Sequence, residues 1–121
     1  MFYRKKLILA LFKELGRELN STQFQKHLFL VTIKQENKSF YFVPYYYGCF
    51  SFQANQDILT MKRQGLLSER DSHIVLVDTK DYFQELTISD QNIIKDVKSK
   101  FGGMSSNDLI RYVYFNSSLN L

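Results

Sequence analysis

An aromatic segment in the middle of the chain places the strongest constraint on the fold. Residues 39–52 read SFYFVPYYYGCFSF, and such a density of aromatic and β-branched residues is typical of extended chain. Pro44 restricts the segment to a sheet edge or an irregular crossing, and Gly48 suits a backbone conformation that larger residues avoid. Because the segment lies between two helical patterns, we expect its rings to pack in the core or in a dimer seam. The alternatives are a surface that stacks bases and a contact for another protein.

Helical periodicity surrounds this segment. Residues 4–15 (RKKLILALFKEL) predict an amphipathic helix with leucine at every fourth position. Residues 22–35 predict a second helix, preceded by an Asn-Ser pair that can act as its N-cap. Ser51 is suited to cap a third helix that runs from Phe52 to about Gln64.

The rest of the chain predicts a hairpin and two further helices. Residues 67–77 read as two short strands joined by a turn at residues 70–72. Helices are expected at about 89–101 and 105–116. The chain ends in NSSLNL without a closing element, which is expected of the front part of a longer protein.

The order helix, helix, extended segment, helix, hairpin is close to that of a winged helix-turn-helix. In that fold three helices share one core and a two-stranded wing follows the third helix. The predicted fold class is therefore α+β and mainly helical: a winged helix-turn-helix with a β-hairpin wing and additional C-terminal helices. We expect residues 1–77 to form the winged-helix core and residues 78–121 to form a helical extension packed on the same domain.

Length and composition favour a single globular domain. The 121 residues allow one core, and 45% hydrophobic with 23% charged residues is an ordinary globular balance. The single cysteine, Cys49, excludes an internal disulfide and a cysteine-based zinc site, and fits a reducing cytosol. The N-terminal apolar run LILALF is too short for a signal peptide or a membrane span. We therefore expect a cytoplasmic, soluble protein without a membrane partner.

Positive charge is concentrated in the first half of the chain. Residues 1–66 carry ten Lys/Arg and four Asp/Glu, whereas residues 67–121 carry six Lys/Arg and eight Asp/Glu. This asymmetry favours a side of the molecule that faces a polyanion. The alternative is an ordinary solvated surface.

Three short motifs carry a resemblance to a known family. Residues 24–30 (FQKHLFL) are similar to an LQK-x-x-FL helix, residues 45–51 (YYYGCFS) to a Y-x-YG-x-FS turn, and residues 58–66 (ILTMKRQGL) to an L-x-x-L-x-x-x-GL helix end. Over residues 4–70 the chain resembles the winged-helix-type domain of a group of largely uncharacterised bacterial proteins. It is more distantly similar to the Panacea domain of SocA-like antitoxins. The resemblance implies a domain found in antitoxins, regulators and genome-defence contexts, without a defined chemistry.

The polar segment after the aromatic run predicts a recognition helix. Asn, Gln, Arg and Lys side chains match base edges in the major groove of double-stranded DNA, and a capped helix N-terminus suits a phosphate. We expect the third helix to enter the groove while the hairpin contacts the flanking backbone. A solvated helix face is the alternative, and Asp57 would repel phosphates. The predicted nucleic-acid-binding residues are Gln53, Asn55, Gln56, Thr60, Lys62, Arg63, Arg70 and Lys26.

These features predict a DNA-binding protein. It would act in transcription regulation or as the DNA-sensing module of a bacterial defence or modification system, as a homodimer formed through the terminal helices. The alternative is a protein-interaction module, an antitoxin or adaptor. Such a module would hold a toxin or effector through the aromatic strand and the acidic residues 78–90.

Signals for catalysis and metal binding are weak, so we expect no enzyme activity, no metal and no cofactor. A Cys–His nucleophile would need Cys49 beside His27 or His73 together with an orienting group, but Cys49 lies in an apolar run. The two histidines are 46 positions apart and lack the spacing of metal ligands.

Overall fold

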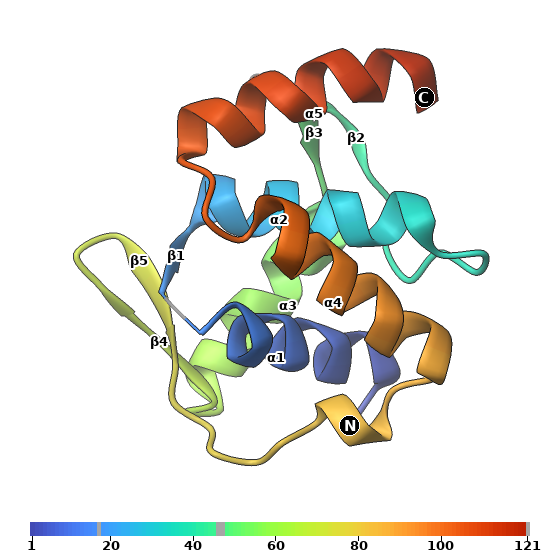
Figure 1. Cartoon of the computed structure of the whole chain (residues 1–121). Coiled ribbons are helices and arrows are strands. Elements are labelled where there is room, and N and C mark those ends of the chain that lie inside the picture. The colour runs from blue at the N-terminus through green and yellow to red at the C-terminus, as the bar shows by residue number, and fades with distance from the viewer. Residues whose placement is uncertain (17, 46–47, 121) are drawn as a thin grey trace.

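The computed structural model of the chain describes residues 1–16, 18–45 and 48–120, with side chains up to residue 115. In these residues the fold is α+β and 59% helical, with five α-helices, one 3-10 helix and small antiparallel sheets (Figure 1). The helices are α1 (Tyr3–Leu15), α2 (Ser21–Lys34), α3 (Phe52–Arg63), η1 (Phe83–Glu85), α4 (Ile88–Phe101) and α5 (Ser106–Asn120). None of the helices in the described residues is both long and apolar enough to cross a bilayer.

The five strands in the described residues form two separate sheets. They are β1 (Leu19–Asn20), β2 (Val43–Tyr45), β3 (Gly48–Phe50), β4 (Leu67–Arg70) and β5 (His73–Leu76). One sheet has the order β1-β5-β4, and the other consists of β2 and β3; all pairs are antiparallel. The short strand between α1 and α2 therefore pairs with the hairpin that follows α3, with Leu19 opposite Ile74.

The β4–β5 hairpin closes through a two-residue turn, at the place that the sequence predicts. Arg70 pairs with His73, so Asp71 and Ser72 form the loop, and both have positive φ, 52° and 65°. Two-residue hairpin loops favour positive φ at both positions because this matches the twist of the strands, and Asp tolerates that conformation. The predicted turn at residues 70–72 is confirmed.

The aromatic segment forms a hairpin instead of one extended crossing. Pro44 lies opposite Cys49 in the two-stranded β2–β3 sheet, where an edge position tolerates its missing N–H. Gly48 has φ 103°, a conformation that strongly favours glycine. Tyr46 and Tyr47, which were expected to pack inside, lie outside the described residues.

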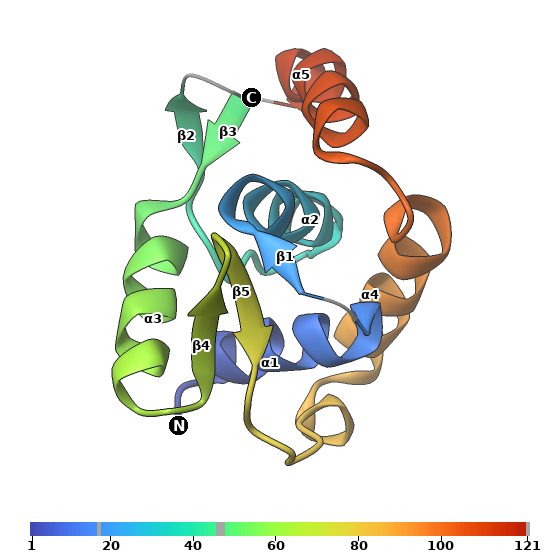
Figure 2. The same cartoon turned by 90° about the vertical axis from the view of Figure 1, so that its left-hand side faces the viewer.

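Helix α2 lies at the centre of the molecule. Figure 2 shows it end-on, with α3 and α4 on opposite sides, α1 beneath it and α5 and the β2–β3 hairpin above it. It packs directly against α4, α5 and β3. Nine consecutive residues, Phe24 to Thr32, are buried, so α2 has no solvated face over two turns. The sequence predicts an amphipathic helix here, but the surrounding elements bury every side of it.

Candidate nucleic-acid interface

Helix α3 separates a buried face from an exposed face. Ala54, Asp57, Ile58 and Met61 are buried, at intervals of three and four residues. The exposed face contains Gln53, Gln56 and Arg63, three of the predicted DNA-contacting residues. Asn55, Thr60 and Lys62 are half-buried at its margins.

The start of α3 is fixed by hydrogen bonds from α2. The Ser51 hydroxyl accepts a hydrogen bond from the backbone N–H of Ala54 at 3.1 Å, which caps the helix. The buried side-chain amide of Gln25 accepts from the backbone N–H of Ser51 at 2.8 Å and donates to its carbonyl oxygen at 3.1 Å. The first turn of α3 is therefore attached to the central helix through two buried backbone groups.

Asp57 does not face the solvent beside the predicted DNA contacts. It is 3% exposed, and its carboxylate accepts hydrogen bonds from Arg4 of α1 at 2.6 Å (Nε) and 3.2 Å (Nη2). The hydrogen bond to Asp57 raises the pKa of Arg4. The expected repulsion of phosphate by Asp57 is wrong, because the charge points inward and a guanidinium compensates it.

The other cations near α3 form ion pairs at the surface. Lys62 Nζ lies 2.6 Å from Glu69 of β4, and Arg70 Nη2 lies 2.9 Å from Glu18, which precedes β1. Exposed pairs of this kind contribute about 0–1 kcal/mol, so either cation can exchange its carboxylate for a phosphate at little cost. Arg63 belongs to no ion pair among the described residues.

Lys26 cannot take part in this surface, so the prediction for it is wrong. It is 3% exposed, and its Nζ donates a hydrogen bond to the backbone carbonyl of Cys49 at 2.7 Å. Gly48 brings the backbone of β3 close to it: a Cβ at Gly48 would lie 3.6 Å from Lys26 Cε. Burial lowers the pKa of Lys26. A side chain enclosed in this way does not reach a phosphate outside the protein.

The aromatic residues divide between the core and the surface. Phe40, Phe42 and Cys49 are buried, as expected of interior packing. In contrast, the rings of Tyr45, Phe50 and Phe52 form a cluster, named here the aromatic patch, with centroids 4.9 to 5.6 Å apart.

The aromatic patch is partly open to solvent. Phe52 is 57% exposed and Tyr45 is 49% exposed, so these two rings do not pack in the core of the single chain, and packing in a dimer seam stays a prediction for them. Leu59, which lies about two turns after Phe52 on the same face of α3, is 42% exposed. The shared exposure of Phe52 and Leu59 follows from the helical period, because residues 52, 56, 59 and 63 form one stripe of α3. The stripe therefore alternates apolar and polar side chains.

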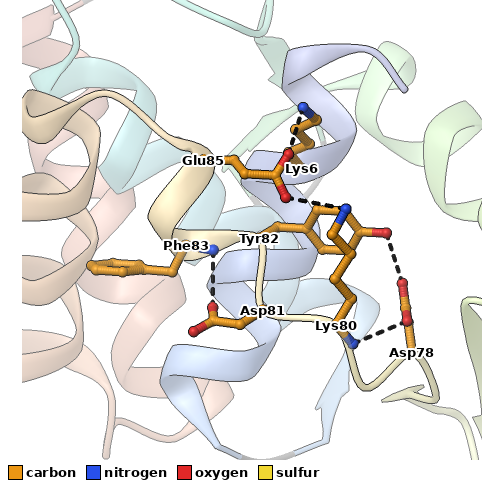
Figure 3. Close-up of polar contacts among 7 residues, drawn as sticks. All are labelled: Lys6, Asp78, Lys80, Asp81, Tyr82, Phe83 and Glu85. Atoms are coloured by element: carbon orange, nitrogen blue, oxygen red, sulfur yellow. Dashed lines mark hydrogen bonds and ion pairs between the residues drawn. The ribbon is translucent and has the colours of Figure 1, made fainter.

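The acidic segment after β5 forms contacts within the protein (Figure 3). Tyr82 donates a hydrogen bond to Asp78 at 2.9 Å, and burial together with this bond raises the pKa of Tyr82. Glu85 lies between Lys6 of α1 at 2.9 Å and Lys80 at 3.2 Å, and the hydrogen bonds from these lysines lower its pKa. The Asp81 carboxylate accepts a hydrogen bond from the backbone N–H of Phe83 at 3.0 Å. Glu85 holds the segment against α1, and Asp78 and Asp81 form contacts within the segment, so these carboxylates are less suited to docking a partner than the sequence implies.

Two of the residues considered for a Cys–His nucleophile are not accessible to solvent at the α3 surface. Cys49 and His27 are both buried, at 1% and 0% exposure. Within the part of the chain that the structure describes, no three His, Cys, Asp or Glu residues come together as metal ligands do.

Comparisons with protein-family models, with curated proteins and with solved structures find no significant match for this chain. The resemblance of residues 4–70 to the winged-helix-type bacterial domain, and the more distant similarity to the Panacea domain, therefore stay predictions.

Proposed function

We propose that residues 1–77 form a winged-helix module that binds double-stranded DNA through α3, in a regulator or in the DNA-sensing part of a bacterial defence or modification system. The observation that carries the proposal is the orientation of α3. Its buried face is fixed to α1 and α2, and Gln53, Gln56 and Arg63 point away from the core beside the β4–β5 hairpin.

The chemistry of this face fits the major groove. Glutamine can bond bidentately to adenine, and Arg63 in the last turn of the helix can reach a backbone phosphate. The β4–β5 hairpin packs beside α3 and carries Arg70 next to its turn, in the place of a wing that contacts the flanking backbone. Phe52 and Leu59 on the same stripe offer apolar contact to thymine methyl groups. As a homodimer, the protein would present two such helices to two half-sites.

Salt dependence of DNA binding tests the proposal. If Lys62, Arg63 and Arg70 each neutralise one phosphate, the slope of log K against log[salt] is about −2.7, so affinity falls about 40-fold between about 50 and 200 mM salt. The measurement is fluorescence anisotropy with a labelled DNA duplex. Arg63→Glu should weaken binding at least tenfold and make the slope shallower by about one.

Lys98→Glu is the matched control for Arg63→Glu. Lys98 is exposed in the last turn of α4, as Arg63 is in the last turn of α3, so both variants change the net charge and the helix-end electrostatics equally. The two helices lie on opposite sides of α2 (Figure 2). Absence of DNA binding at about 50 mM salt, or equal weakening by both variants, would contradict the proposal.

The exposed aromatic patch favours a second candidate function, the binding of a partner protein by an antitoxin or adaptor. Rings left half-exposed are typical anchors of protein interfaces. A partner held in this way would be lost with Phe52→Ser, would be little affected by Arg63→Glu, and would respond weakly to salt. DNA binding, in contrast, should weaken strongly with salt and with Arg63→Glu. The two functions are therefore distinguishable with the same variants.

A further inference from the structure

Lys26 is a buried cation for which the described residues provide no carboxylate partner, and the neighbouring Cys49 is the group whose charge interaction favours its protonated form. Its ammonium has three hydrogen-bond donors, and the Cys49 carbonyl accepts one of them. None of the ion pairs in the described residues includes Lys26. Burying an unpaired charge is costly, so proteins usually supply a counter-ion or shift the group towards its neutral form.

A small cavity adjoins this lysine. Its volume is about 90 Å³, and it lies between the first turns of α2 and the β2–β3 hairpin. The cavity is lined by Ser21, Thr22, Gln25, Lys26, Tyr45 and Phe50. Since an apolar cavity of about 150 Å³ holds one benzene ring, this cavity has room for a carboxylate or phosphate group but not for a base or a nucleoside.

The polar groups of the cavity are suited to an anion. Lys26 is cationic, and Ser21 and Thr22 add hydroxyl donors at the N-terminal end of α2, where the helix dipole is positive. Among the described residues, those that line the cavity include no carboxylate. The Gln25 amide is held by both backbone groups of Ser51, which use one of its two N–H donors and one lone pair of its oxygen.

We propose that this cavity binds a small oxyanion, a carboxylate or phosphate group, with Lys26 as its counter-charge and the hydroxyls of Ser21 and Thr22 as further donors. The site is separate from the DNA-contacting face of α3, because none of its lining residues belongs to that helix. The proposal therefore does not depend on DNA binding. Tyr45 and Phe50 close the cavity on the side of the aromatic patch.

The first test uses inorganic phosphate and acetate as probes at constant ionic strength, with chloride as the reference salt. Binding at the cavity should raise the melting temperature of the native protein by several degrees, because a ligand of the folded state stabilises it. The amide signals of Ser21, Thr22 and Lys26 should move in titrations followed by ¹H–¹⁵N NMR. A response to phosphate alone or to acetate alone identifies the group that is bound, and both results support the site. No response to either anion overturns it.

Variants then test the role of Lys26. Lys26→Met removes the charge and nearly keeps the shape, and should abolish both the melting-temperature shift and the amide shifts of Ser21 and Thr22. Lys98→Met, at an exposed position of α4, is the matched control and should keep both. If Lys26→Met does not fold, Thr22→Val replaces it and should weaken binding severalfold. Amide shifts confined to exposed lysines of the native protein would overturn the proposal.

Discussion

At the level of single residues, three charged side chains are buried among the described residues, Lys26, Asp57 and Asp90, and only Asp57 is in an ion pair. Asp57 receives the guanidinium of Arg4 in two hydrogen bonds, so its burial in α3 is matched by a cation. Lys26 donates one hydrogen bond, to the backbone carbonyl of Cys49. Removing one partner of a buried pair leaves an isolated charge, which is the situation that Lys26 already has. Lys26 is therefore expected to make the stability of the protein depend on pH.

The buried Lys26 predicts a dependence of stability on alkaline pH. Its pKa in the folded protein lies below the ordinary value of 10.5, chiefly because burial disfavours the charged form. Between these two pKa values the unfolded chain binds more protons than the folded protein, so the free energy of unfolding rises with pH in this window. This gain in the free energy of unfolding is complete above about pH 10.5, and it is lost as the pH falls through the pKa of Lys26 in the folded protein.

The measurement compares urea unfolding of the native protein and Lys26→Met at several pH values from about 7 to 10.5, in buffers without phosphate or carboxylate. The difference in unfolding free energy, native minus variant, should increase with pH by up to about 1.4 kcal/mol per pH unit. Lys98→Met, whose lysine is exposed, should show no such trend. A difference for Lys26→Met that is flat over this range would contradict the prediction.

At the level of elements, the orientation of α3 depends on its attachment to α2. Gln25→Leu would leave the Ser51 N–H buried without its partner, whereas the Ser51 carbonyl keeps the hydrogen bond that it accepts from the backbone N–H of Asn55. An unsatisfied buried group costs about 1–3 kcal/mol. We expect a loss of about 1–3 kcal/mol in the free energy of unfolding, measured in urea. Gln53→Leu, the same substitution on the exposed face of α3, should change it by less than about 0.5 kcal/mol. Equal losses for the two variants would contradict this account of α3.

The sequence predicts the elements that depend on local signals and misses those that depend on distant partners. Helices such as α1 and α3 follow from apolar spacing and from the Ser51 cap, so their predicted bounds are within one residue of the structure. Strand β1 was not predicted, because two residues carry no period and its partner β5 lies more than fifty positions away.

The candidate site is predictable to a similar extent. The outward positions of Gln53, Gln56 and Arg63 follow from the period of α3. The burial of Lys26 does not follow from local sequence, because α4, α5 and β3, which close around α2, come from later parts of the chain. The exposure of Phe52 was missed for a related reason: its place in an aromatic run suggested the core, whereas the stripe of α3 that it shares faces outward.

At the scale of the whole molecule, α2 connects the two proposed sites. Its first turns form one wall of the oxyanion cavity, and its Gln25 side chain fixes the start of α3. The opposite wall of the cavity, Tyr45 and Phe50, contacts the ring of Phe52, the first residue of α3, with centroids 5.6 and 4.9 Å away. A negative charge held in the cavity therefore lies close to the end of α3 that is proposed to face DNA phosphates.

This arrangement predicts that the bound oxyanion lowers DNA affinity. The anion cancels the charge of Lys26 and adds repulsion towards the duplex, an effect of about two- to fivefold for charges partly screened by solvent. The measurement is DNA affinity at constant ionic strength, with chloride exchanged for phosphate or acetate, whichever binds the cavity. The native protein should lose affinity, and Lys26→Met should show no change. Because coupling between two binding sites is reciprocal, DNA should weaken oxyanion binding by the same factor. Equal weakening in the native protein and in Lys26→Met would show that the anion acts elsewhere, even if each site binds its own ligand.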